Sequence, residues 1–178
     1  WLPNLEALKT VATPVVVELF GHGRSPAPAD VDCYHPEYYV SVFEDIRRQL
    51  GVARWNLLGY SLGAGLTLRY SLLHANRVNV QMFTNSTSAF AEESVTAPIR
   101  QNADKILSQY ESDGHAAVEA IPVHPRNAKR LPKPVLNALL EDCKLLDPMG
   151  VARTIVYTNG YASVRDKIAD NIVPTLLL

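Results

Sequence analysis

The segment NLLGYSLGAGL, residues 56–66, places a single serine between two glycines, at the point where one hydrophobic pattern gives way to another. The apolar run before the serine is typical of a buried strand, and the small and apolar residues after it are typical of a helix. A strand that turns directly into a helix at Gly-x-Ser-x-Gly holds the serine at positive φ and exposes its hydroxyl. The pattern therefore predicts a nucleophile elbow with Ser61 as the nucleophile. The alternative is a glycine-rich turn whose serine has no chemical role.

The neighbours of the serine have separate expected roles. We expect Gly59 and Gly63 to be glycines because the backbone at both positions passes too close to its surroundings for a β-carbon, and Tyr60 completes the turn. Leu62 is expected to begin the helix, where backbone N–H groups form the positive end of the helix dipole. Its N–H is therefore the predicted first donor to an oxyanion that develops beside Ser61.

Outward from the elbow, apolar runs and helical spacings alternate along the chain, with short connections between them. This order predicts right-handed crossovers and a parallel sheet, so the fold class is α/β. Tyr39, Val42, Ile46 and Leu50 are expected to form the buried face of the second helix. The expected helices cover residues 2–11, 36–50 and 62–76, and the expected strands cover residues 14–20, 55–60 and 78–85.

A different organisation follows the third expected strand. Helical pieces interrupted by a proline-rich stretch run to about residue 170, which is too long for a loop. The apolar segment 171–178 then has the composition of a strand that rejoins the sheet. The sequence thus predicts core residues 1–85, a helical cap or lid over residues 86–170, and a returning core strand at 171–178.

The composition excludes several classes of protein. The chain has 178 residues, of which 47% are hydrophobic, and a formal net charge of −1, so it has no basic surface for nucleic acid. No apolar run is long enough to span a membrane. Cys33 and Cys143 are too far apart in the sequence for a zinc motif, and we expect two reduced thiols in a cytoplasmic protein with no metal and no cofactor. Because the chain starts at Trp1 and stops within an apolar run, we also expect an internal piece truncated at both ends.

The order VVVELFGHGRS, GYSLGAG, IVPTLLL resembles the α/β-hydrolase superfamily. Members often carry an Asp-x-x-Gly-x-Gly-x-Ser loop one strand before the elbow. Gly21, Gly23 and Ser25 match that loop, and Glu18 stands where Asp is usual. The resemblance implies a doubly wound, mostly parallel sheet with a helical cap between its sixth and seventh strands. Ser61 at the elbow argues against the haloalkane dehalogenase and epoxide hydrolase branches, whose nucleophile is an aspartate.

The resemblance also implies where the rest of the machinery lies. In this superfamily the acid usually follows the seventh strand and the histidine the eighth, and both positions fall beyond Leu178. The second oxyanion donor comes from a loop that would precede Trp1. His22, in the first loop, is a candidate for lining the site, although a turn histidine is the favoured interpretation. His115 is the cap histidine to test as a base, but none of the five is a good triad candidate; the others are His35, His74 and His124.

The leading hypothesis is a serine hydrolase that cleaves a carboxylic ester or related acyl bond of a small molecule through an acyl-enzyme on Ser61. Two alternatives stay open: hydrolysis of a carbon–carbon bond or an enol-lactone with the same triad, and a ligand-binding homologue without turnover. Tyr157 and Tyr161 are expected to line an acyl or alcohol pocket, with packing of the cap as an equal alternative. The 178 residues alone are expected to be catalytically silent, and the sequence leaves the oligomeric state open.

Overall fold

Parallel strands carry the elbow, as the alternating pattern predicts. In the computed structural model, which describes residues 1–84 and 87–178, the sheet has the order β1-β2-β3. Strand β1 pairs with β2 from Trp55 opposite Val78 to Tyr60 opposite Thr84, and β2 pairs with β3. The predicted boundary between core and cap, at residues 85 and 86, lies outside the described residues. The strands are β1 (Trp55–Tyr60), β2 (Val78–Thr84) and β3 (Thr175–Leu177).

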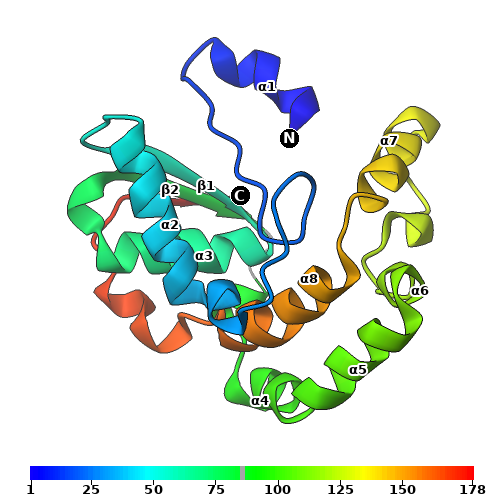
Figure 1. Ribbon diagram of the computed structural model, residues 1–178. Coiled ribbons are helices and arrows are strands. Elements are labelled where there is room, and N and C mark those ends of the chain that lie inside the picture. Colours follow the sequence, from blue (N-terminus) through cyan, green and yellow to red (C-terminus); the bar gives the residue numbers. More distant parts are fainter. Residues whose placement is uncertain (85–86) are drawn as a thin grey trace.

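Two helices cover one face of this sheet (Figure 1). Helix α3 (Leu62–Leu73) forms the crossover from β1 to β2, and α2 (Pro36–Gln49) packs beside it. Both helices are confirmed, although α3 ends three residues before the predicted position. Their shared core contains aromatic and aliphatic side chains from both helices and both strands, which are Tyr39, Val40, Phe43, Leu57, Leu66, Tyr70 and Val78.

The buried face of α2 agrees with the predicted one at Tyr39, which is buried, and at Ile46, which packs against the core, but not at Leu50. Leu50 is 48% exposed, whereas Val40 and Phe43 are buried. The buried stripe follows the spacing of three and four residues expected for a helix, but it includes Arg47, which no apolar pattern selects. This guanidinium can be buried because it pairs with Glu44 at 2.7 Å and donates to backbone carbonyls after the helix.

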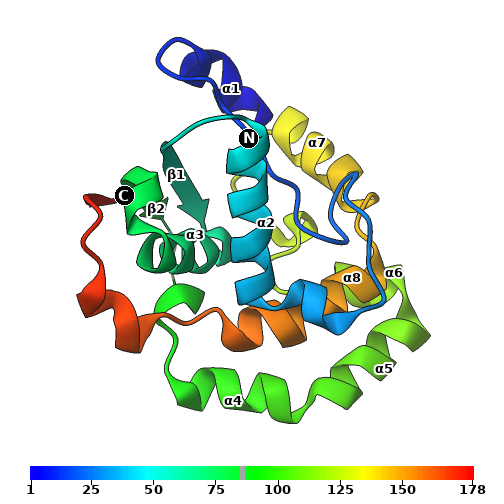
Figure 2. The same cartoon turned by 60° about the vertical axis from the view of Figure 1, so that its left-hand side comes forward.

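The predicted strand at residues 14–20 is wrong. The segment is extended but has no ladder hydrogen bonds, and Val15, Val16 and Val17 are 38% to 48% exposed. A β-branched run becomes a strand only beside a hydrogen-bonded neighbour, and none of the strands in the described ranges runs alongside this one. Before it, α1 (Leu2–Lys9) stands away from the sheet (Figures 1 and 2).

The helical character of the region after β2 is confirmed. Helices α4, α5 and α6 follow one another in an arc below and beside the core, and α7 and α8 lead back toward it (Figure 2). That this region is a separate cap domain stays a prediction. None of the helices in the described part of the chain combines the length and hydropathy needed to cross a bilayer. The helices are α4 (Glu93–Gln101), α5 (Ala103–Asp113), α6 (His115–Glu119), α7 (Lys133–Cys143) and α8 (Pro148–Arg153), followed by a π-helical turn at Thr154–Thr158.

Candidate active site

Ser61 forms the turn between β1 and α3. Its backbone has φ 52° and ψ −120°, and it is the one non-glycine residue with positive φ in the ranges that the structure describes. The residue is exposed, and its backbone N–H donates to the Thr84 carbonyl of β2 at 3.1 Å. A serine in this position normally accepts a hydrogen bond from the helix that follows, but its side chain makes no such capping bond here. In the described part of the chain the Ser61 hydroxyl therefore does not serve as the cap of α3.

The two glycines of the motif have different reasons to be glycine. A β-carbon built at Gly59 would lie 2.4 Å from the Thr67 hydroxyl and 2.6 Å from the Ala64 α-carbon, so this position needs a glycine. At Gly63 a β-carbon would meet no atom of the described residues within 4 Å, so the predicted steric demand is not found there. The close approach falls instead at Gly65, whose β-carbon would lie 2.8 Å from the Ala162 carbonyl oxygen.

The first turn of α3 presents unbonded N–H groups beside the serine. Ala64 donates to the Ser61 carbonyl at 2.9 Å, so the N–H groups of Leu62 and Gly63 precede the first helical hydrogen bond. With no side chain capping them, these donors and the helix dipole favour a negative charge at the Ser61 side chain. The arrangement suits stabilisation of an oxyanion, as predicted for Leu62.

The loop before the elbow is organised around Glu18. Its carboxylate accepts from the Arg24 backbone N–H at 3.0 Å, and its carbonyl accepts from the Ser25 hydroxyl at 2.8 Å. Gly23, at φ 59°, has no room for a β-carbon because the Glu18 carboxylate lies 2.6 Å from that position. Glu18 therefore forms the loop contacts at the position where members of the α/β-hydrolase superfamily usually have aspartate.

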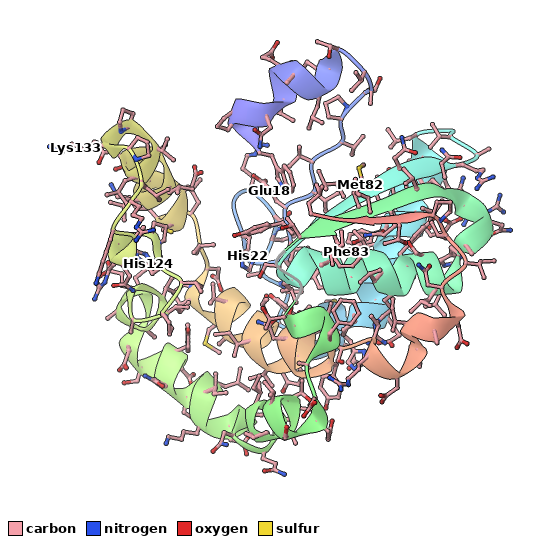
Figure 3. The ribbon with its side chains drawn as sticks, turned by 180° about the vertical axis from the view of Figure 1, so that it is seen from behind. Glu18, His22, Met82, Phe83, His124 and Lys133 are labelled. Carbon is pink, nitrogen blue, oxygen red and sulfur yellow. The ribbon has the colours of Figure 1, made fainter. Side chains whose placement is uncertain are left out.

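None of the five histidines is placed as a base for Ser61 in the described ranges. His22 Nδ1 is 2.9 Å from the Phe20 carbonyl oxygen, which holds the ring within its own loop. Figure 3 shows His22 and Glu18 on that loop, between the sheet and the part of the chain that bears His124 and Lys133. His115 is exposed at the start of α6. The remaining rings have local partners. His35 pairs with the Glu37 carboxylate, the His74 ring packs against the Tyr70 ring, and His124 Nδ1 accepts a hydrogen bond from the Arg126 N–H.

The two candidate pocket tyrosines lie in different surroundings. Tyr161 is 40% exposed, with its ring 4.7 Å from the His35 ring and 5.1 Å from the Arg100 guanidinium carbon. It borders a hollow of about 500 Å³ beside α3 and α4 that is lined mainly by charged residues. Tyr157 is half-buried in the π-helical turn, a conformation that often occurs at functional sites. Tyr161 therefore borders a hollow, and the acyl or alcohol pocket role of both tyrosines stays a prediction.

Sequence reasoning missed a polar network beneath the elbow. Gln81 of β2 is fully buried, and its amide nitrogen donates to the Thr67 hydroxyl at 2.9 Å. Thr67 in turn donates to the Gly63 carbonyl at 2.8 Å, and Ser71 donates to the Gln81 amide oxygen at 3.1 Å. The signal was present, because Gln81 stands between Val80 and Met82 in the expected strand VNVQMFT, and a glutamine there is either exposed or fully hydrogen-bonded.

Comparisons with known proteins agree with this geometry. A family profile described as alpha/beta hydrolase fold matches residues 1–128. The (lyso)-N-acylphosphatidylethanolamine lipase of Bos taurus is 35% identical over 81 residues, which are 44% of this chain and 23% of the lipase. Epoxide hydrolase 3 of Xenopus tropicalis is 25% identical over 203 aligned residues, covering 100% of this chain and 53% of the relative.

Solved structures share the fold. MenH from S. aureus superimposes with a TM-score of 0.73 at 17% identity, over 90% of this chain and 62% of MenH. At this identity the likeness concerns the fold alone. The chain spans about half or less of the two curated relatives, at 53% and 23% of their lengths.

Proposed function

The chain belongs to the alpha/beta hydrolase fold family, and from that membership we propose that it carries the nucleophile of a serine hydrolase acting on a carboxylic ester or related acyl bond. The observation that carries the proposal is the exposed Ser61, held at positive φ between strand and helix without a capping bond. A serine that served only to cap α3 would have its oxygen on the helix N–H groups. Among the described residues Ser61 makes no such bond, so its oxygen does not occupy the N–H groups of the first turn of α3.

The proposed reaction follows from these atoms. The Ser61 oxygen attacks the acyl carbon, and the carbonyl electron pair moves onto the oxygen, which the Leu62 N–H stabilises. A base takes the hydroxyl proton and returns it to the leaving alcohol as the carbon–oxygen bond breaks. Water then attacks the acyl-enzyme and releases the acid. The base and its carboxylate partner are expected to be the histidine and acid of the family pattern, because His22 and His115 have no contact with Ser61 in the described structure.

The names of the relatives support the acyl class in different degrees. The lipase relative acts, by its name, on an acylated lipid, and its aligned part makes a long-chain ester the first substrate to test. The epoxide hydrolase relative aligns along the whole chain, but that branch of the family uses an aspartate nucleophile where this chain has Ser61. A serine alkoxide and an oxyanion donor favour acyl transfer over epoxide opening.

The test is labelling with a fluorophosphonate probe, followed by mapping of the modified peptide. In the protein that carries this sequence we expect the probe on Ser61, loss of labelling in Ser61→Ala, and full labelling in the matched control Ser112→Ala, which removes an exposed serine of α5. A series of acyl esters then reports turnover.

Three results would overturn the proposal. Absence of labelling together with tight binding of a small molecule would favour the ligand-binding homologue. Conversion of an aryl epoxide to its diol that survives Ser61→Ala would favour the epoxide branch. Cleavage of an enol-lactone or a carbon–carbon bond with no turnover of open-chain esters would replace the open-chain ester as the substrate while retaining the nucleophile.

A further inference from the structure

Gln81 is a fully buried amide on the face of β2 that packs against α3. Burying an amide without hydrogen bonds costs several kcal/mol, so the surroundings of this side chain must satisfy it. They do, because its nitrogen donates to the Thr67 hydroxyl at 2.9 Å and to the Met82 carbonyl at 3.1 Å. Its oxygen accepts from the Ser71 hydroxyl at 3.1 Å.

The Thr67 hydroxyl connects this amide to the elbow. It lies in the space that Gly59 leaves by having no side chain, since a β-carbon there would be only 2.4 Å away. After accepting from Gln81, the hydroxyl donates to the Gly63 carbonyl at 2.8 Å. The chain of hydrogen bonds therefore starts inside the sheet and ends two residues after Ser61.

A second bond ties the elbow to the same strand. The Ser61 N–H donates to the carbonyl of Thr84, three residues after Gln81 on β2. Strand β2 thus holds the turn from two sides, through its backbone at Ser61 and through a side chain at Gly63. The first turn of a helix frays most readily, and its free N–H groups need a fixed direction to stabilise charge.

We propose that Thr67 and Gln81 are positioning residues of the elbow, which aim the Leu62 and Gly63 N–H groups at charge developing on and beside the Ser61 side chain. This inference rests on the proposed function, because a fixed donor direction matters only if Ser61 reacts. A purely structural network would stabilise α3 against the sheet and leave the environment of the Ser61 side chain unchanged.

The experiment replaces the hydroxyl by a titratable probe. Ser61→Cys is made together with Cys33→Ser and Cys143→Ser, so that the introduced thiol is the single one within these 178 residues, and the alkylated peptide is mapped to identify it. Its alkylation by iodoacetamide is followed against pH to obtain the pKa of the thiol. Donors and a helix N-terminus lower this pKa below the usual value of about 8.5.

Variants of the network then separate positioning from stability. Thr67→Val and Gln81→Met should raise the pKa of the introduced thiol by roughly one pH unit at most. At a fixed pH below that pKa, this corresponds to a thiolate fraction that is about threefold to tenfold smaller. Thr67→Ser keeps the hydroxyl and should retain the lowered pKa. Thr158→Val is the matched control, since it removes a fully buried hydroxyl that donates to the Tyr34 carbonyl at 2.6 Å.

The outcomes distinguish this inference from the proposed function. If Ser61→Cys alone titrates as an ordinary thiol, the elbow does not stabilise negative charge and the proposed function loses its support. If the pKa is lowered and stays so in Thr67→Val and Gln81→Met while urea unfolding shows lost stability, positioning is wrong and the proposed function stands. Should either variant fail to fold, Thr67→Ala takes its place, because it removes the same hydroxyl with a smaller side chain; a raised pKa of the introduced thiol supports positioning, and an unchanged lowered pKa contradicts it.

Discussion

Replacing Ser61 by glycine should make the protein more stable while removing the candidate nucleophile. At φ 52° and ψ −120° a residue with a β-carbon is strained by about 1–3 kcal/mol, and glycine is not. Glycine also gives the unfolded chain more freedom, which offsets about 0.4–1 kcal/mol of that gain. No capping bond is lost, because the serine side chain makes none. We therefore expect Ser61→Gly to raise the free energy of unfolding by about 1 kcal/mol.

The assay is urea unfolding of the parent, Ser61→Gly and Ser61→Ala, supported by thermal melting. Alanine loses the same hydroxyl but keeps the β-carbon, so the difference between the two variants isolates the backbone strain. A gain of about 1 kcal/mol corresponds to a rise in Tm of roughly 2–4 °C for a chain of this size. If alanine costs about 1 kcal/mol and glycine lowers the stability of the parent by a few tenths of a kcal/mol, Ser61 acts as an ordinary helix cap and the reasoning from strain is refuted.

Two further predictions use contacts away from the serine hydroxyl. Gly59→Ala should destabilise the fold by about 3 kcal/mol because its β-carbon would lie 2.4 Å from the Thr67 hydroxyl, whereas the control Gly63→Ala has open space within 4 Å and should be neutral or stabilising in urea unfolding. Hydrogen bonds from Arg47 lower the pKa of Glu44 from 4.5 to about 2, so the charged carboxylate stabilises the fold above about pH 4.5 and this contribution is lost as pH falls toward 2. Solvent screens this ion pair, so the expected loss is about 1 kcal/mol; urea unfolding of Glu44→Gln should lack that part of the acid dependence, and an unchanged pH profile would contradict it.

The elbow could be predicted because its signals are local. A serine between glycines, after an apolar run and before small residues, determines the turn with little help from the rest of the chain, and β1 and the start of α3 follow from the same stretch. Gly59 was predicted for the right reason, since Thr67 occupies its side-chain space. The predicted reason for Gly63 was incorrect. The space around a residue in the first turn of a helix depends on tertiary packing, which the motif does not encode.

The errors arise where a residue depends on a distant partner. The run Val15–Val17 has every local property of a strand but no paired neighbour in the described structure, so it stays extended and partly exposed. Arg47 is buried through Glu44, which no hydrophobic periodicity reports. The hydrogen bonds between Gln81 and Thr67 join residues on different elements, and the sequence shows only that a glutamine interrupts an apolar strand.

The glycine contacts between core and helical region have an evolutionary consequence. The Gly21 backbone lies against Gly150 so closely that a β-carbon on either would come within 2.5 Å of the other's α-carbon, and Gly65 meets Ala162 in the same manner. Substitutions are therefore expected to be rare at these two contacts, and a larger residue at one member of a pair requires a compensating change at the other. Helix α7, which buries none of its residues, is under no such constraint. Natural divergence should therefore concentrate in the helical segment around α7, before Gly150. A new segment can be grafted there while the elbow stays intact.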